Sequence, residues 1–254
     1  MDMHLRDRVV LITGGASGIG RACVQAVLAE SAKVLIVDRD PSGGEVASSF
    51  RQQGYCVEFA QADTTLETDI RRAVKQAKDR FGQLDAVIAC AGISGPVGST
   101  APDISTEDWD RVMAVNVKGN FLIAKHTLEL LSASEVGTLV FLASDAALVA
   151  FEGMTPYCTS KGAVLMLAKS LSVDHPRIRV NCLCPGIVDT PMSRADLGRP
   201  EGFAGTDLPI MSASQIARHA VFLASPVSAP MNGTSLITDF GYVARSALPA
   251  LDFK

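Results

Sequence analysis

Short, nearly continuous runs of apolar residues alternate along the chain with stretches of helical periodicity. Because almost every position in these runs is apolar, they are typical of strands buried on both faces of a sheet. Between them, apolar residues recur with the 3.6-residue period of a helix. The predicted strands are residues 9–13, 33–38, 56–63, 85–92, 137–144, 179–186 and 234–241, and the predicted helices are about 18–30, 42–53, 66–81, 106–132, 156–174 and 213–225.

Alternation of strand and helix predicts an α/β fold with a parallel sheet and helices on both of its faces. The seven runs predict a doubly wound, seven-stranded sheet with right-handed crossovers. No repeat or linker divides the chain, so residues 1–254 are expected to form a single domain. The segment 189–212, rich in Pro, Gly, Ser and Asp, has no clear periodicity and is predicted to be a binding loop over the substrate.

Composition and charge exclude several classes of protein. Hydrophobic residues make up 48% of the chain and charged residues 20%, as in globular proteins. The net charge of −4 gives no reason to expect nucleic acid or an anionic membrane as a partner. The sequence contains no apolar run of membrane-spanning length, and its start, MDMHLRDRVV, lacks an apolar signal core. We therefore expect a cytoplasmic protein.

Cysteine and histidine give no metal-binding pattern. The six cysteines are scattered, contain no CxxC pair and lie mostly among apolar residues, and the four histidines are isolated. These patterns predict buried, reduced thiols and no metal cofactor.

A glycine-rich turn follows the first predicted strand and opens the first predicted helix. Gly14, Gly18 and Gly20 are spaced as G-x-x-x-G-x-G within a strand–helix–strand unit. Glycine lets the backbone approach a pyrophosphate, and the helix N-terminus favours the anion. The pattern in this context predicts a Rossmann-type fold that binds a dinucleotide.

Asp38 ends the second predicted strand, 18 residues after Gly20. A carboxylate at this place accepts hydrogen bonds from ribose hydroxyls and repels a 2′-phosphate, which favours NAD over NADP. Arg39 follows it and could instead hold a 2′-phosphate, but the glycine turn contains no basic residue to assist.

The segment TPYCTSKGAV brings Tyr157 and Lys161 to one face of a predicted helix, with Thr155 as its N-cap and Pro156 as its first residue. A cation near Tyr157 lowers the pKa of the phenol and makes it a usable general acid or base. Alone, the pair is also compatible with an ordinary helix face.

From TGGASGIG (13–20) to the last strand, the chain resembles the short-chain dehydrogenase/reductase family. The resemblance implies a catalytic tetrad of Asn116, Ser144, Tyr157 and Lys161. Tyr157 would exchange a proton with an alcohol or ketone, while Ser144 binds the reacting oxygen. Lys161 would hold the nicotinamide ribose, and Asn116 would distort its helix and hold a water that relays protons.

The resemblance also implies a set of residues that contact the dinucleotide. They are Gly14, Ser17, Gly18, Ile19, Gly20, Asp38, Arg39, Asp63, Thr64, Cys90, Ala91, Gly92, Tyr157, Lys161, Pro185, Gly186, Val188 and Thr190. Two positions depart from the family pattern. Cys90 replaces an Asn that braces the turn beneath the ribose, and Phe240 stands where the family often has Gly.

The sequence predicts a mostly apolar substrate pocket with two acids, Asp145 and Glu152, nearby. Its other expected members are 94–97, 146–148, 151, 153–154, Met192, Phe203 and Met211. We expect an NAD-dependent dehydrogenase of a neutral secondary alcohol, or a carbonyl reductase.

Two alternative functions remain at this point: a 3-ketoacyl-acyl-carrier-type reductase and a non-catalytic dinucleotide sensor. The family resemblance further implies a homotetramer, or less often a dimer, with helices 106–132 and 156–174 at an interface. The partly apolar tail after Gly241 is expected either to pack on a neighbouring subunit or to fray.

Overall fold

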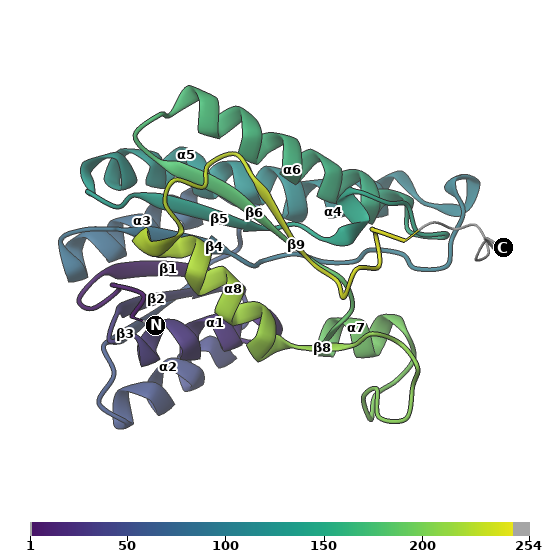
Figure 1. The fold of residues 1–254 in the computed structure, drawn as a ribbon, viewed down its shortest axis with the longest axis horizontal. Helices are drawn as coiled ribbons and strands as arrows, with labels where there is room; N and C mark the ends of the chain where they lie inside the picture. The colour runs from purple at the N-terminus through teal and green to yellow at the C-terminus, as the bar shows by residue number, and fades with distance from the viewer. Residues whose placement is uncertain (1, 246–254) are drawn as a thin grey trace, which may run out of the picture.

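A seven-stranded parallel sheet forms the centre of the protein in this computed structural model, which describes residues 2–245 (Figure 1). The strands lie in the order β3-β2-β1-β4-β5-β6-β9, so the chain winds outward in both directions from β1 and β4. This order confirms the predicted doubly wound fold. The strands are β1 (Val9–Thr13), β2 (Lys33–Asp38), β3 (Val57–Gln61), β4 (Ala86–Ala89), β5 (Thr138–Leu142), β6 (Arg179–Pro185) and β9 (Ser235–Thr238).

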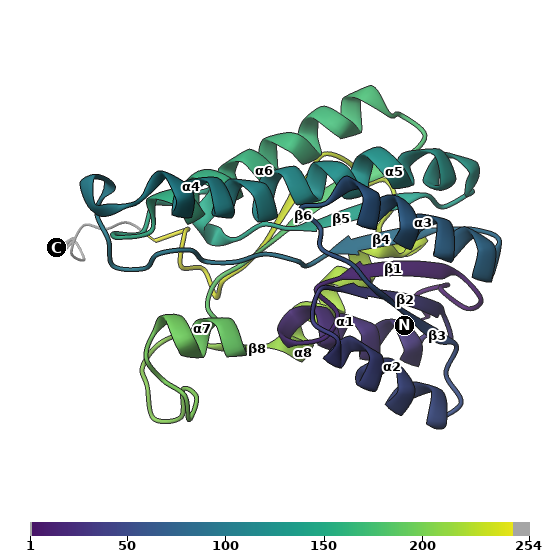
Figure 2. The ribbon, with the colours of Figure 1, turned by 180° about the vertical axis from the view of Figure 1, so that it is seen from behind.

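Helices cover both faces of the sheet (Figures 1 and 2). One face carries α1 (Gly18–Ala29), α2 (Ser42–Gln52) and α8 (Ala213–Ala224), and the other carries α3 (Glu67–Phe81), α4 (Thr106–Met113), α5 (Gly119–Ala133) and α6 (Thr155–Asp174). Successive strand residues pack into opposite cores, because side chains alternate across a strand. Leu11 belongs to the core beneath α5 and α6, and Ile12 to the core beneath α1 and α8. This two-sided burial explains the continuous apolar runs.

The predicted helix over 106–132 is divided in the structure. α4 ends at Met113, a π-helical turn spans Ala114–Lys118, and α5 continues from Gly119. Periodicity alone did not reveal the interruption, because a π-helical turn inserts one residue without ending the helix.

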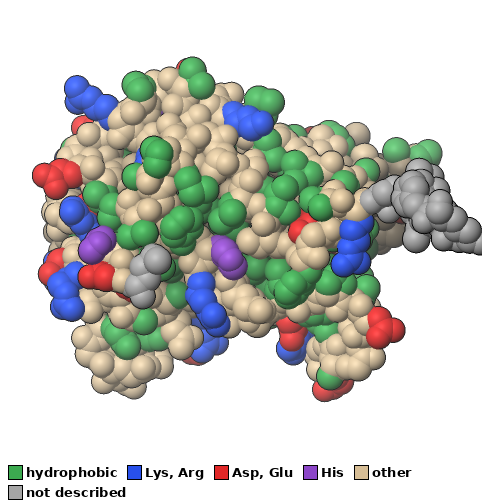
Figure 3. All heavy atoms as spheres, viewed as in Figure 1, with side chains coloured by type: hydrophobic (Ala, Val, Ile, Leu, Met, Phe, Trp, Pro, Cys, Tyr) green, Lys and Arg blue, Asp and Glu red, His purple; other side chains and the backbone are tan. Residues whose placement is uncertain are grey.

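The segment 189–212 contains more regular structure than the sequence predicted. Short strands β7 (Val188–Asp189) and β8 (Met211–Ser212) pair with each other, and α7 (Pro191–Asp196) lies between them. Thr190 and Ser193 form a capping box at the start of α7. In Figure 1 this segment projects from the body of the molecule beside β8, and in Figure 3 it forms a separate lobe.

The prediction that Thr155 is the N-cap of α6 is wrong by one residue. The helix begins at Thr155, since the amide of Cys158 already donates a hydrogen bond to the carbonyl of Met154 at 2.9 Å. Pro156 is therefore the second helical residue, where its missing N–H costs nothing.

No helix among residues 2–245 is long and apolar enough to span a bilayer. The expectation for the C-terminal tail concerns, in part, residues 246–254, which lie outside the described residues.

Candidate active site

The glycine turn between β1 and α1 is packed so closely that side chains would not fit. Gly14 has a φ of +68°, and a Cβ there would lie 2.9 Å from the amide nitrogen of Ala91. A Cβ on Gly20 would lie 2.1 Å from the carbonyl oxygen of Gly14. The glycines thus allow α1 to start directly against the turn, with its first N–H groups at the carboxyl edge of the sheet.

A groove runs along this edge, beside the point where the strand order reverses between β1 and β4. Ligands of doubly wound folds bind at such a switch point. Among the expected dinucleotide contacts, the groove is lined by Gly14, Ser17, Gly18, Ile19, Gly20, Asp38, Arg39, Asp63, Thr64, Cys90, Ala91, Gly92 and Thr190. Ala16, Val115 and Pro191 also line it and were not predicted.

Asp38 is fixed in the groove by two backbone amides. Its Oδ2 accepts a hydrogen bond from the amide of Ala16 at 3.0 Å, and its Oδ1 accepts one from the amide of Asp40 at 3.0 Å. Each carboxylate oxygen can accept more than one hydrogen bond, so Asp38 remains able to accept from ribose hydroxyls. Arg39 is exposed at the rim of the groove.

Asp63 is engaged mainly in its own loop. Its Oδ1 accepts hydrogen bonds from the amide of Thr65 at 2.8 Å and from the Thr65 hydroxyl at 2.7 Å. Such an Asx turn is a structural use of the carboxylate. Asp63 also lines the groove.

The turn containing Cys90 is braced from β1. The hydroxyl of Thr13 accepts a hydrogen bond from the amide of Ala91 at 3.1 Å, and the amide of Cys90 donates to the carbonyl of Thr13 at 3.2 Å. A hydrogen bond with the neighbouring Cys23 thiol, together with burial, raises the pKa of the Cys90 thiol well above its usual value. The turn is therefore held by contacts of its backbone with Thr13, and the raised pKa keeps the Cys90 thiol neutral.

The cysteines differ in their surroundings more than the sequence suggested. Cys23, Cys182 and Cys184 are buried free thiols, as predicted. Cys90 and Cys158 are only partly buried, and Cys56 is exposed, so the prediction of burial is wrong for these three. Cys56 precedes β3 at a loop end, where the apolar pattern did not indicate exposure.

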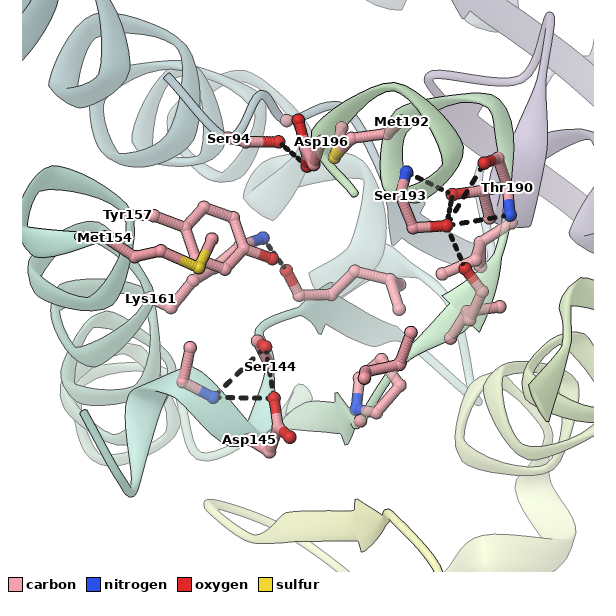
Figure 4. A pocket seen from close by; sticks show the side chains of 18 of the residues that line it. Ser94, Ser144, Asp145, Met154, Tyr157, Lys161, Thr190, Met192, Ser193 and Asp196 are labelled. Carbon is pink, nitrogen blue, oxygen red and sulfur yellow. Dashed lines mark hydrogen bonds between the residues drawn. The ribbon is translucent and has the colours of Figure 1, made fainter. Parts of the chain in front are cut away.

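A second, largely apolar cavity adjoins the groove and contains Tyr157 and Lys161 (Figure 4). Ile19, Cys90, Gly92, Thr190 and Met192 line both spaces, so they are continuous. The predicted residues Ser144, Pro185, Gly186 and Val188 line this cavity as well. A dinucleotide along the groove would therefore place one end in the cavity beside Tyr157.

Tyr157 and Lys161 share a face of α6, with Lys161 Nζ 5.4 Å from the centre of the Tyr157 ring. Lys161 is buried, and its ammonium donates a hydrogen bond to the carbonyl of Leu142 at 2.8 Å. Burial lowers the pKa of Lys161 to about 8.

The prediction that Lys161 lowers the pKa of Tyr157 is wrong for the chain itself. The pKa of Tyr157 is raised to about 12: burial is the largest cause, a hydrogen bond with Ser144 lowers the pKa, and the nearby carboxylates of Asp145 and Asp196 raise it. Lys161, whose Nζ lies 5.4 Å from the centre of the ring, is not among the main groups that shift the pKa of Tyr157.

Ser144 follows β5 and brings its hydroxyl to the cavity. It donates a hydrogen bond to Oδ1 of Asp145 at 2.8 Å and accepts one from the amide of Ala146 at 3.1 Å. Asp145 is 6% exposed, and burial raises the pKa of its carboxyl group. The hydroxyl is thus held at the end of a rigid strand, next to Tyr157.

Asn116 lies in the π-helical turn and does not line the cavity. Its amide group accepts from the amide of Ile93 at 2.9 Å and donates to the carbonyl of Ile93 and the hydroxyl of Ser160, both at 2.9 Å. The expected helix distortion is present. The side chain joins the loop after β4 to α6, and no hydrogen bond to Lys161 is formed.

The predicted substrate pocket is correct along one wall and wrong along another. Ser94, Val97, Asp145, Ala146, Phe151, Met154 and Met192 line the cavity as expected. Phe203 and Met211 are instead 7% and 4% exposed and do not line it, and Glu152 is an exposed residue outside it. Apolar side chains of the segment 189–212 can either line the cavity or be buried elsewhere in the protein. The sequence alone does not show which of the two applies to a given residue.

Asp196, at the end of α7, is a cavity residue that the sequence analysis missed. It accepts a hydrogen bond from the hydroxyl of Ser94, 102 residues away in the chain. Its position depends on the unexpected helix α7, so no local pattern indicated it.

Phe240 follows β9 with a left-handed backbone, at a φ of +55°. Glycine adopts this conformation without steric cost, which explains why the family often has Gly at this position. Asp239 stabilises the turn by accepting hydrogen bonds from the amides of Gly241 and Val243 at 2.8 and 2.7 Å. The turn brings Tyr242 to stack on Phe151, with ring centres 6.0 Å apart.

Comparison with known proteins agrees with this geometry. The sequence model of the family "short chain dehydrogenase" matches residues 8–199. The chain belongs to this family. It is therefore related to oxidoreductases that use a nicotinamide dinucleotide.

Several relatives of this short-chain dehydrogenase are named for the alcohols on which they act. It is 36% identical to a 2-(R)-hydroxypropyl-CoM dehydrogenase of Xanthobacter autotrophicus, over 94% of the chain and 99% of the relative. It is 31% identical to (+)-borneol dehydrogenase 2 of Salvia officinalis, over 97% of the chain and 93% of the relative.

Solved structures share the fold over nearly the whole chain. Levodione reductase has a TM-score of 0.89 at 28% identity, covering 96% of this chain and 100% of the other. A 3-ketoacyl-(acyl-carrier-protein) reductase from Brucella melitensis was solved with NADH, with a TM-score of 0.85 at 28% identity over 93% of this chain and 98% of the other. ElxO was solved with NADP and has a TM-score of 0.85 at 26% identity, covering 94% of this chain and 100% of the other. The neighbours thus include structures solved with each of the two dinucleotides.

Proposed function

We propose that this protein interconverts a neutral secondary alcohol and its ketone with NAD(H), using Tyr157 as general acid and base. One observation carries the proposal: Tyr157 and Ser144 lie together in an apolar cavity that is continuous with the dinucleotide groove. A proton-transfer group and a hydrogen-bonding hydroxyl are thus beside the place where a nicotinamide ring would lie.

The groove fits a dinucleotide on its own features. The close approach of Gly14 and Gly20 leaves no side chain between α1 and a pyrophosphate, and Asp38 offers carboxylate oxygens to ribose hydroxyls. When bound, NAD⁺ supplies the hydride acceptor and a positive charge. The remaining chemistry belongs to the side chains of the chain.

In alcohol oxidation, the Tyr157 phenolate takes the hydroxyl proton of the substrate. The Ser144 hydroxyl turns from Asp145 to the substrate oxygen and stabilises the charge that develops there. Lys161, fixed by the carbonyl of Leu142, is available to nicotinamide ribose hydroxyls. Asn116 acts at a distance by holding the loop after β4 against α6. In ketone reduction the same groups act in reverse.

Preference for NAD over NADP is supported by Asp38. A 2′-phosphate would lie near this carboxylate, whose two oxygens are fixed by backbone amides and cannot turn away without losing those hydrogen bonds. Arg39 is the one cation that lines the groove among the described residues, and it is exposed to solvent.

The test is reduction of NAD⁺ with a panel of neutral secondary alcohols, including borneol and substituted cyclohexanols, followed at the absorbance of NADH. We expect turnover, and a loss of kcat/KM of about 10²- to 10⁴-fold in Tyr157→Phe. NADH binding by the variant, measured by fluorescence, should stay close to that of the wild type. Full turnover by Tyr157→Phe would refute the mechanism.

A further inference from the structure

The substrate cavity is lined by more acidic than basic side chains. Asp145, Asp196 and Lys161 are the charged residues that line it within residues 2–245. Lys161 is buried, and its ammonium is held by the carbonyl of Leu142, to which it donates a hydrogen bond at 2.8 Å.

The nearest candidate for an anion anchor is already occupied. Arg194 lies on α7, two residues before Asp196, but both ends of its guanidinium are bound by Asp189. Its Nε donates to Oδ1 at 2.6 Å and its Nη2 to Oδ2 at 3.0 Å. The guanidinium is thus paired with a carboxylate, and Arg194 does not line the cavity.

The two carboxylates approach the reacting groups from opposite walls. Figure 4 shows Asp145 below Tyr157, beside Ser144, and Asp196 above it, beside Ser94. Both raise the pKa of Tyr157, after the larger effect of burial, so both are close enough to act on a charge in the cavity.

Each carboxylate also has an oxygen that no described side chain or amide supplies with a hydrogen bond. Asp145 uses Oδ1 for Ser144 and Ala146, and Asp196 uses Oδ2 for Ser94, which leaves Oδ2 of Asp145 and Oδ1 of Asp196. A Cβ added at Gly186, another residue that lines the cavity, would lie 3.4 Å from Oδ2 of Asp145. A carboxylate oxygen in a largely apolar cavity favours a ligand that can donate a hydrogen bond to it.

We infer that the substrate carries a second hydrogen-bond donor, a hydroxyl or an ammonium group, and no anionic group, and that Asp196 determines this selection. The inference rests on the function proposed above and adds the class of substrate. Apolar residues such as Val97, Phe151 and Met154 contact the carbon skeleton of the substrate. The carboxylates of Asp145 and Asp196 accept hydrogen bonds from its polar substituent.

The physical reason is the weak screening inside an apolar cavity. Two carboxylates repel an anionic substituent far more strongly there than in water, and they attract an ammonium group to the same extent. A hydroxyl group is attracted less strongly by the carboxylates than an ammonium group, because it carries a dipole and no net charge.

The experiment compares kcat/KM for NAD⁺-dependent oxidation of four probes: cyclohexanol, cyclohexanediols, aminocyclohexanols and hydroxycyclohexanecarboxylates, each in its ring isomers. For the wild type we expect the best aminocyclohexanol and cyclohexanediol to exceed cyclohexanol, and every carboxylate to fall about tenfold or more below it. In Asp196→Asn, the carboxylate probes should gain about tenfold relative to cyclohexanol, and the amino probes should lose a similar factor.

Two control variants separate charge from structure. Asn at position 196 can still accept the hydrogen bond from Ser94, whereas Ser94→Ala removes that hydrogen bond and keeps the charge. Glu201→Gln neutralises an exposed acid of the same segment that does not line the cavity. Both controls should keep the wild-type order of probes.

The inference would be overturned if the wild type oxidised the carboxylate probes with a kcat/KM equal to that for cyclohexanol. It would also be overturned if Ser94→Ala changed the kcat/KM values of the probes in the same way as Asp196→Asn. The two proposals fail in different ways. No oxidation of any neutral alcohol would refute the proposed function, whereas oxidation of cyclohexanol without a preference by charge would refute the substrate selection alone.

Discussion

Tyr157 is surrounded by groups that keep its phenol protonated. Burial raises the pKa to about 12, and the carboxylates of Asp145 and Asp196 act in the same direction. Lys161 has its own pKa lowered to about 8 by burial and lies over the ring. The sequence presents this pair as a cation that lowers the pKa of a phenol. In the structure the pKa of the Tyr157 phenol is raised instead, so additional positive charge is needed to favour its ionised form.

The raised pKa of Tyr157 predicts opposite effects of pH on the two directions of the reaction. Oxidation needs the deprotonated phenol, which is the minor form below the pKa, so kcat/KM for the alcohol should rise with pH between about 6 and 9. Reduction needs the protonated form and should not rise over this range. Initial rates of NADH formation and consumption, at saturating dinucleotide, test both directions. An oxidation rate that falls as pH rises would contradict the assignment.

Asp38 predicts the preference between the two dinucleotides. The wild type should bind NADH about tenfold or more tightly than NADPH, and Asp38→Ser should reduce this ratio by removing the charge that opposes a 2′-phosphate. Fluorescence titration with each dinucleotide measures the ratio. Glu45→Gln, an exposed acid on α2 outside the groove, is the matched control and should leave it unchanged. Tighter binding of NADPH by the wild type would refute the argument.

At the scale of elements, the site depends on an interruption between two helices. The π-helical turn Ala114–Lys118 directs Asn116 toward Ile93 and Ser160, which ties the α4–α5 region both to the loop after β4 and to α6. Asn116 is only 1% exposed. Its three side-chain hydrogen bonds therefore hold the elements that carry Gly92 and Tyr157.

Removal of this connection should cost stability as well as activity. Asn116→Ala removes the hydrogen bonds of its side chain to the part-buried amide and carbonyl of Ile93 and to the hydroxyl of Ser160, and we expect the free energy of unfolding to fall by about 2–4 kcal/mol. Ser160→Ala removes only one of the three hydrogen bonds and should cost about 1 kcal/mol. Urea denaturation compares the two variants. Equal losses would show that the contacts to Ile93 contribute little.

The sequence predicted a helix or strand accurately where the same spacing of apolar residues continues from its first residue to its last. Most of the seven strands are nearly continuous apolar runs, and their observed bounds differ from the predicted ones by at most a few residues. The prediction was less accurate for α7 and for the π-helical turn. Their position depends on contacts such as the pairing of β7 with β8 and the hydrogen bonds of Asn116.

At the scale of the whole molecule, apolar side chains remain exposed on one helical layer. Phe121 on α5 and Met166 and Val173 on α6 are 46%, 58% and 78% exposed. Figure 3 shows apolar side chains on the part of the surface where α6 runs. We propose that α5 and α6 form an interface of a homotetramer, in keeping with the expectation from the family resemblance.

This proposal predicts a particle of about four times the mass of one chain by light scattering. Met166→Glu should place a charge in the interface and shift the protein to smaller species, because an unpaired charge is costly to bury. Tyr55→Glu, which changes a partly exposed aromatic residue between α2 and β3, should keep the wild-type mass. A wild type that is only monomeric would refute the proposed interface.

The sequence by itself determined the doubly wound sheet, the glycine turn and the family of the protein. These features follow from local periods and from the steric need for glycine, both of which neighbouring residues specify. Only the tertiary structure decided the raised pKa of Tyr157, the burial of Phe203 and Met211 and the position of Asp196 in the cavity. Burial and electrostatic fields arise from residues far apart in the chain, such as Ser94 and Asp196, and no local pattern contains them.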